Sequence, residues 1–414
     1  MLAFVIINVV IFMSREEAKS VILDMMDFFD NGESDYEGIH SVGHPGFYFF
    51  HYKEEMLGEL NKNLTKKEYS RFDIVYIVSK LLAFLLSKYD SHTSIRFLKE
   101  VYFPITFKMV GEDVYVLDCA KEIGNLRGAK VLSVNKVDID KIKQEIIDRT
   151  CYSTDGYVKY SIKSILQSYK ELKTLPSIDS KVKEIDYELL LNDEVKHIKL
   201  NTNSLEYDYN NAKPNYVYEV RDDTMILTYS SCKDFDKMKD FVREIGDVAS
   251  DNNINKFIVD IRDNRGGNSE VIKPLLEFLE GKEIVTLVNE TTFSAARMAF
   301  VDLRKLGSYS VGTRISTSLN CFGNNTRSKC YEDLGLSICG ATKYFYYDKY
   351  LNRTTLTSKE DFESFFKGRE ELLEPFILEP DEIVEITLED IKNGKDSQMD
   401  MAINYLNNSV KVIK

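Results

Sequence analysis

The sequence lacks the features that mark most nucleic-acid-binding proteins. No run of five or more lysines and arginines occurs in its 414 residues, and the formal net charge at pH 7 is −13. Nucleic-acid binding needs a basic face that neutralises phosphates, so we expect no nucleic-acid partner. Hydrophobic residues make up 43% and charged residues 29%, which is typical of globular proteins. The length allows two or three domains.

The chain also lacks several short motifs. No CxxC pair occurs among its six cysteines, which argues against a zinc ribbon or a thioredoxin-type redox site. Cys321, Cys330 and Cys339 are close in sequence, so a disulfide among them can form, but free buried thiols are the favoured interpretation. Neither the GK[ST] of a phosphate-binding loop nor a GxGxxG dinucleotide fingerprint is present.

The N-terminal segment, residues 1–13, is apolar except for Asn8. As a helix it would be about 20 Å long, short of the ~30 Å hydrocarbon core of a bilayer. It has no basic n-region, and no small-residue cleavage site follows it. A signal-peptide remnant, a membrane anchor and a buried first element all remain open. We favour targeting or anchoring, which predicts membrane association through this segment and a cell-envelope or secreted location, with a cytoplasmic location as the alternative.

Helical patterns at 14–31 and 66–90 predict a helical N-terminal domain over residues 14–97. Residues 98–205 contain short β segments instead, and the expected strands are 114–118, 129–135 and 197–201. GAKVLSVNKVDIDKIKQEI is typical of the strand-then-helix half of a PDZ module. Because the glycine-rich carboxylate-binding loop of a PDZ domain is not evident, we expect a small, partial PDZ-like β region.

Residues 206–414 show near-continuous apolar strands that alternate with helices. The expected strands are 224–230, 256–262, 283–290 and 308–315, and the expected helices are 234–249 and 294–306. This alternation is typical of an α/β domain with a largely parallel sheet.

Two successive strand-to-helix turns in this domain carry residues suited to catalysis. In FIVDIRDNRGGNSEV, Gly266 and Gly267 let backbone N–H groups point together toward an oxyanion. In NETTFSAARMAF, Ser294 stands between a strand and an apolar helix, so it suits a helix N-cap or a nucleophile. The carboxyl ends of neighbouring parallel strands converge on one crevice. We therefore predict an oxyanion hole formed by the N–H of Gly266 or Gly267 and that of Ala295.

The chain resembles the C-terminal-processing (tail-specific) and tricorn-type serine peptidases in an ordered set of motifs. These are DIRDNRGGNSEVIKPLLEFL, VNETTFSAARMAFVDLRKLGSYSVGTR, LNCFGN and EPDEIVEITLEDIKNGKDSQMDMAINYL, with GHPGFY and SKYDSHTS upstream. The likeness spans most of the chain from about residue 40. It implies a crotonase/ClpP-like spiral α/β catalytic core, with Ser294 as the nucleophile and no metal or organic cofactor.

The two branches of this family differ in the general base. One branch uses a lysine about two dozen residues after the serine, but SVGTRISTSLNCFG contains none. The tricorn-type branch uses a histidine with an adjacent serine and a glutamate near the end of the core. By resemblance these are His92, Ser91 and Glu374. His44 and His51 remain the alternatives for the base.

We therefore expect a serine endopeptidase that hydrolyses peptide bonds of polypeptide substrates. His92 would take the Ser294 proton, Ser294 would attack the carbonyl, and water would hydrolyse the acyl-enzyme. An imidazole with an ordinary pKa near 6.5 predicts loss of activity at acidic pH.

Two departures from the family pattern leave other functions open, Arg297 after Ser-Ala-Ala and the stretch ISTSLN in place of a glycine-rich turn. The first alternative is a non-catalytic peptide- or hydrophobe-binding protein on the same fold, for which the related interphotoreceptor retinoid-binding proteins are precedents. A crotonase-type acyl-CoA enzyme is the second alternative. The substrate and the oligomeric state do not follow from the sequence.

Overall fold

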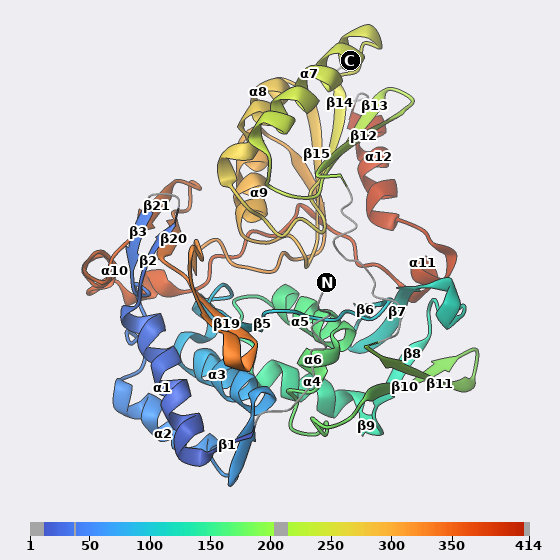
Figure 1. The fold of residues 1–414 in the computed structure, drawn as a ribbon. Helices are drawn as coiled ribbons and strands as arrows, with labels where there is room; N and C mark the ends of the chain where they lie inside the picture. The colour runs from blue at the N-terminus through green and yellow to red at the C-terminus, as the bar shows by residue number, and fades with distance from the viewer. Residues whose placement is uncertain (1–11, 37–38, 203–213, 410–414) are drawn as a thin grey trace, which may run out of the picture.

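The computed structural model describes residues 12–36, 39–202 and 214–409, and it shows a mixed α/β fold (Figure 1). Most of the N-terminal hydrophobic segment, residues 1–13, lies outside the described residues, so its role stays a prediction. Within the described ranges, no helix is both long and apolar enough to cross a membrane.

Three helices form the N-terminal part, at the lower left of Figure 1: α1 (Arg15–Asn31), α2 (Lys53–Asn63) and α3 (Arg71–Leu86). Ser14 and Ser70 cap α1 and α3 with reciprocal capping boxes, which explains where both helices begin. Helix α3 is apolar on most of its surface and packs in the hydrophobic core of the N-terminal part, together with residues of α1 and α2. Both expected helices are confirmed, although the second begins later than the pattern suggested.

Short strands surround these helices. They are β1 (Phe12–Ser14) paired with β4 (Glu68–Ser70), the hairpin of β2 (Glu33–Tyr36) and β3 (Ile39–Val42), and β5 (Ser94–Phe97).

A second sheet, at the lower right of Figure 1, has the order β11-β10-β8-β7-β6, with β9 beside β8. Its strands are β6 (Ile105–Val110), β7 (Asp113–Cys119), β8 (Lys130–Val134), β9 (Val137–Asp138), β10 (Glu184–Leu191) and β11 (Glu194–Asn201). Its helices are α4 (Ile139–Asp148), α5 (Asp155–Gln167) and α6 (Tyr169–Leu172). The strand-then-helix unit of β8, β9 and α4 and all three expected strands are confirmed. Strands β6 and β10 were not predicted.

The α/β core, at the top of Figure 1, contains a six-stranded sheet of order β12-β13-β14-β15-β16-β22. Its strands are β12 (Tyr216–Arg221), β13 (Thr224–Tyr229), β14 (Lys256–Asp260), β15 (Glu283–Val288), β16 (Tyr309–Gly312) and β22 (Glu382–Ile383). All neighbours are parallel except β12 and β13. The expected strand–helix alternation is therefore confirmed, with an antiparallel edge hairpin in addition.

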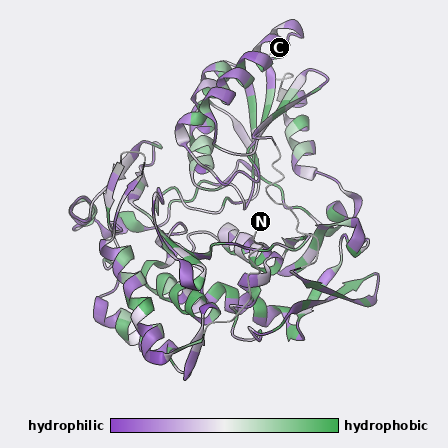
Figure 2. Ribbon diagram, viewed as in Figure 1, coloured by the Kyte–Doolittle hydropathy of each residue, from purple (hydrophilic) through white to green (hydrophobic). Residues whose placement is uncertain are grey.

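Helices cover both faces of this sheet. Helices α7 (Phe235–Asp251), α8 (Lys273–Leu279) and α9 (Ala295–Lys305) pack on one face, and α12 (Ser397–Ser409) packs on the other. Figure 2 shows hydrophobic residues along the central strands, which are buried on both faces. The carboxyl ends of β13, β14 and β15 consequently meet at one edge, where the candidate site lies.

Residues 321–373 leave the core and pack against the N-terminal part. Their elements are β17 (Cys321–Gly323), β18 (Arg327–Tyr331), β19 (Leu336–Gly340), β20 (Lys343–Tyr347), β21 (Arg353–Leu356) and α10 (Lys359–Phe366); the chain later forms α11 (Leu388–Asn393). Strand β19 pairs with β5, so the segment after the core strands completes a sheet begun in the N-terminal part.

All six cysteines lie within the described residues and are free thiols. The expectation of free rather than paired cysteines is confirmed. Only Cys321 of the three clustered cysteines is buried, whereas Cys330 is exposed, so their expected burial is wrong for Cys330.

Candidate active site

Ser294 lies between β15 and α9 in a backbone conformation that a serine rarely adopts. Its φ is 57° and its ψ is −122°. A helix N-cap normally has an extended backbone and a side chain that accepts an N–H of the first turn. Ser294 has neither feature, because no side-chain capping bond forms. Ser294 therefore stands at the N-cap position of α9 without capping the helix through its side chain, and a strained residue of this kind, at a cost of about 1–3 kcal/mol, is typical of functional sites.

The glycine turn after β14 lies directly against Ser294. A Cβ atom added to Gly266 would be 2.8 Å from the Ser294 Cβ and 2.7 Å from the Ala295 nitrogen. Gly266 also has a φ of +91°, so both the close approach and the backbone conformation require glycine. The structure thus brings together the two strand-to-helix turns that the sequence singled out.

Asn264 holds these turns in register, although sequence reasoning did not identify it. Its buried side chain donates to the Tyr229 carbonyl (2.8 Å) and accepts the Gly266 N–H (2.8 Å). The backbone carbonyl oxygen of Asn264 accepts the N–H of Phe293, the residue before Ser294, at 3.0 Å. One residue therefore ties the end of β13, the glycine turn and the serine loop together. The asparagine of NRGG was the available signal.

The three candidate oxyanion donors are not equivalent. The Gly266 N–H is already used by Asn264. Neither the Gly267 N–H nor the Ala295 N–H donates to a protein acceptor among the described residues. Gly267 and Ala295 are therefore the donors still available to a developing oxyanion.

His92 is buried beside the serine loop. Its ring stacks on Phe293 with 4.3 Å between ring centroids, and its side chain comes from the turn that precedes β5. No hydrogen bond joins His92 to Ser294 in the described structure. Catalytic hydrogen bonds are often long in ligand-free enzymes, so His92 remains a candidate base on its position beside the serine loop.

Asp90 and His44 hold the turn that carries His92. The Asp90 carboxylate accepts the backbone N–H groups of His92 (2.5 Å) and Thr93 (3.0 Å). It also accepts from His44 Nε2 at 3.0 Å, while His44 Nδ1 accepts the Gly46 N–H. His44, an alternative base in the sequence, is thus fully engaged in positioning this turn. His51 lies elsewhere, stacked on Phe84.

Burial keeps the His92 imidazole neutral. The pKa of His92 is lowered to about 3, mainly by burial; Asp90 acts in the opposite direction, and the charges of Arg297, Arg265 and Arg96 add to the lowering. A base that is neutral at pH 7 can accept a proton, but one with so low a pKa is a weak base until its surroundings change.

The expected supporting residues of His92 are placed very differently. Ser91 is buried next to His92, and neither its hydroxyl nor His92 Nδ1 has a hydrogen-bond partner among the described residues. The Glu374 side chain is 69% exposed, and both its oxygens accept from Lys88 Nζ at 2.9 Å. No described contact joins Glu374 to His92. The structure therefore brings Ser91 to the site and leaves Glu374 in a surface ion pair.

Arg297 and the ISTSLN stretch, the two departures from the family pattern, contact each other. The buried Arg297 guanidinium donates to the carbonyls of Ser318 (3.0 Å) and Leu319 (2.7 Å). It thereby links the first turn of α9 to the chain that follows β16.

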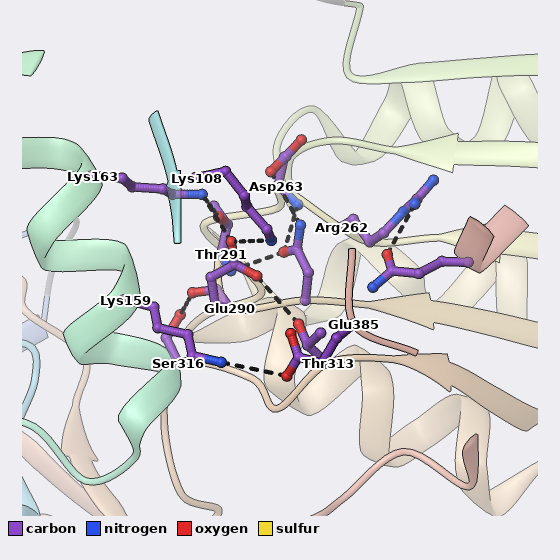
Figure 3. A network of polar contacts seen from close by, with 12 residues as sticks. Lys108, Lys159, Lys163, Arg262, Asp263, Glu290, Thr291, Thr313, Ser316 and Glu385 are labelled. Carbon is purple, nitrogen blue, oxygen red and sulfur yellow. Dashed lines mark hydrogen bonds and ion pairs between the residues drawn. The ribbon is translucent and has the colours of Figure 1, made fainter. Parts of the chain in front are cut away.

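A buried polar network joins the serine loop to the second sheet (Figure 3). Glu290, four residues before Ser294, accepts from Lys108 Nζ at 2.6 Å and from Thr313 Oγ1 at 3.2 Å, and Lys163 Nζ lies at 3.5 Å. Burial raises the pKa of Glu290, but the two lysines outweigh it and hold this pKa well below its usual range. The network fixes the serine loop against β6 and α5.

Comparisons with known proteins show similarity in structure only. No protein-family model matches the sequence, and no curated protein matches it. The structure of mature CPAF complexed with lactacystin matches with a TM-score of 0.62 at 11% identity, covering 96% of this chain and 98% of that one. Mature CPAF alone matches with a TM-score of 0.58 at 11% identity, over 93% and 95% of the two chains.

A photosystem II D1 C-terminal processing protease also matches, with a TM-score of 0.43 at 12% identity over 90% and 94% of the chains. That similarity is too loose to define a shared fold. The match to CPAF covers nearly the whole of both chains, and the protein therefore has the overall fold of CPAF.

Proposed function

We propose that the protein is a serine endopeptidase that hydrolyses peptide bonds through an acyl-enzyme. One observation carries the proposal. Ser294 is held in a strained conformation at a strand-to-helix turn, against Gly266, and the N–H groups of the adjacent residues Ala295 and Gly267 make no hydrogen bond to the described residues. Such strain persists only where the surrounding structure maintains it, and here it presents a hydroxyl next to oxyanion donors.

The proposed chemistry uses only protein groups. His92 accepts the Ser294 proton as the hydroxyl attacks the substrate carbonyl, and the Gly267 and Ala295 N–H groups bind the oxyanion. His92 then protonates the leaving amine, and water hydrolyses the ester. Each oxyanion donor typically contributes about 2.7–4 kcal/mol of transition-state stabilisation.

The alternative is a non-catalytic peptide- or hydrophobe-binding protein on the same fold. It is favoured by the buried Nδ1 of His92, which has no orienting partner among the described residues, and by the surface ion pair of Glu374. A triad histidine normally has a third group that selects its tautomer. In the proposed peptidase, the Ser91 hydroxyl beside His92 takes this role.

A fluorophosphonate probe distinguishes the two functions, because it reacts covalently with an activated serine. We expect the wild-type protein to be labelled, and Ser294→Ala and His92→Ala to remain unlabelled. His51→Ala is the matched histidine control and should be labelled like the wild type. A folded wild-type protein that stays unlabelled would contradict the peptidase and favour the binding protein.

The location of the protein follows only from residues 1–13. On their apolar composition we propose a cell-envelope or secreted protein. Fractionation of cells that produce the full chain tests this, and recovery only in the cytosolic fraction would contradict it.

A further inference from the structure

A cavity of about 360 Å³ lies beside the candidate active site and extends between α3, β5 and α5. It begins at the site itself, because Ser91, next to His92, and Arg265, next to Gly266, both line it. Tyr157 and Tyr160 of α5 form much of another wall. The cavity therefore adjoins the candidate site through the neighbours of His92 and Gly266.

The cavity has an excess of positive charge. Three arginines line it, Arg96, Arg149 and Arg265, and the one carboxylate in its described lining is Glu171. Glu171 is paired with Arg149 at 2.7 Å. Three cations and one anion leave two positive charges without a carboxylate. One is Arg96, which is exposed and donates from Nε to Ser94 Oγ at 3.0 Å, and the other is Arg265.

Arg265 is the more unusual of the two. Its guanidinium lies 3.8 Å from the ring centroid of Tyr160 and 4.2 Å from that of Phe293. Among the described residues it makes no hydrogen bond or ion pair, and its Nη1 is buried without an acceptor. The Ser91 hydroxyl, in the same lining, is likewise buried without a partner. Buried donors without acceptors are costly, so a ligand that supplies an acceptor is favoured.

The charges also act on neighbouring groups. Burial raises the pKa of the Tyr160 phenol, yet Arg265 and Lys163 outweigh this and bring the pKa below its ordinary value. A phenol that ionises more easily despite burial indicates a positive potential at Tyr160, whereas burial outweighs Arg265 at Tyr157 and raises the pKa of that phenol to about 12.

From this geometry we infer that the cavity binds a carboxylate of the peptide substrate, held by Arg265 and Arg96 beside the Ser91 hydroxyl. Arginine pairs with carboxylates through parallel N–H···O bonds, so a carboxylate would supply the acceptor that the buried Nη1 of Arg265 lacks, with Arg96 at the exposed side of the cavity. The carboxylate can belong to an acidic side chain or to the end of a polypeptide. That the bound peptide is a substrate rests on the proposed peptidase function, but the binding itself needs no catalysis.

Bound carboxylate would also change the base. Arg265 and Arg96 both lower the pKa of His92, and an anion between them would offset that effect. A substrate that fills the cavity would thus strengthen the base that acts on Ser294.

The test uses full-length Ser294→Ala protein and fluorescent alanine–glycine heptapeptides, with binding measured by anisotropy up to millimolar concentration. One peptide pair compares internal Glu with internal Gln, both with amidated ends. The other pair compares a free C-terminal carboxylate with the amide. We expect the carboxylate member of at least one pair to bind on the order of tenfold more tightly, as for a charge-assisted hydrogen bond. The pair that shows the preference identifies the source of the carboxylate.

Arg96→Gln and Arg265→Gln should each abolish this preference, and Arg243→Gln, which removes an exposed arginine of α7, should keep it. Equal binding of acid and amide in both pairs, no binding of any peptide, or a preference that survives in both cavity variants would overturn the inference. Fluorophosphonate labelling of the wild type tests separately whether the protein is a serine peptidase. A carboxylate preference without labelling would leave the cavity as the site of a binding protein.

Discussion

The substitution Gly266→Ala tests whether the glycine turn shapes the serine loop. The new Cβ would lie 2.7 Å from the Ala295 nitrogen, 2.8 Å from the Ser294 Cβ and 2.9 Å from the Phe293 carbonyl oxygen. Because two of these are backbone atoms, the serine loop itself must move. Gly266 also has a φ of +91°, a conformation that costs a residue with a Cβ about 1–2 kcal/mol.

Gly307→Ala is the matched control. Gly307 has a φ of +88°, nearly that of Gly266, but an added Cβ there would meet no atom within 4 Å. The free energy of unfolding of Gly307→Ala should therefore decrease only by the cost of the backbone conformation, about 1–2 kcal/mol. Gly266→Ala should lose this and a further ~1–3 kcal/mol for overpacking.

The two variants should differ more in reactivity than in stability. A displacement of about 1 Å at a reacting group can cost about 100-fold in rate, so fluorophosphonate labelling of Gly266→Ala should slow by roughly that factor. Labelling of Gly307→Ala should match the wild type. Urea unfolding supplies the free energies. Gly266→Ala that labels at the wild-type rate and is no less stable than Gly307→Ala would refute the reasoning.

Four further predictions concern buried titratable groups. The pKa of His92 is near 6.5 in the unfolded chain and about 3 in the folded protein, so the unfolded state binds a proton first as the pH falls. Protonation of His92 therefore favours unfolding: the free energy of unfolding has its full value above pH 6.5 and decreases as the pH falls toward 3. Between pH 7.5 and 5, the free energy of unfolding measured in urea should therefore fall by about 2 kcal/mol more for the wild type than for His92→Gln. An equal decrease in the two proteins would contradict the lowered pKa of His92. By the same shift, labelling should stay flat from pH 7 to 5, rather than fall near 6.5 as the sequence alone suggests; a midpoint near 6.5 would indicate an ordinary histidine. Asp90→Asn should lower the unfolding free energy by about 3 kcal/mol and abolish labelling, because an amide N–H₂ would face the donating Nε2 of His44, and unchanged labelling would show that Asp90 does not hold the base. Lys108→Met should cost about 3 kcal/mol by breaking the buried pair with Glu290, whereas a loss below 0.5 kcal/mol would mean that the network does not dock the serine loop.

Much of the local structure was readable from the chain. Alternation of apolar strands with helices predicted the core sheet, and the two strand-to-helix turns were identified by Gly266 and Ser294. These features are local, because hydrophobic periodicity and turn residues act over a few positions. The resemblance in motifs anticipated a peptidase-like fold, and the structural match to CPAF agrees with it at the level of fold.

Other features depended on contacts between distant segments. That Ser294 is strained rather than a helix cap follows from its packing against Gly266, 28 positions earlier in the chain. The lowered pKa of His92 needs burial and three arginines from other elements. Motif spacing suggested Glu374 as a partner of His92, but spacing cannot show that Lys88 takes its carboxylate at the surface.

The sequence by itself therefore determined the strand–helix alternation of the core, its two strand-to-helix turns and which residues could do chemistry. Only the tertiary structure decided which backbone N–H groups remain free and how far the pKa of His92 is lowered. It also decided that Arg96 and Arg265 line one cavity without acidic partners. The physical reason is that burial and electrostatic interaction depend on distance in space, which the spacing of residues along the chain does not specify.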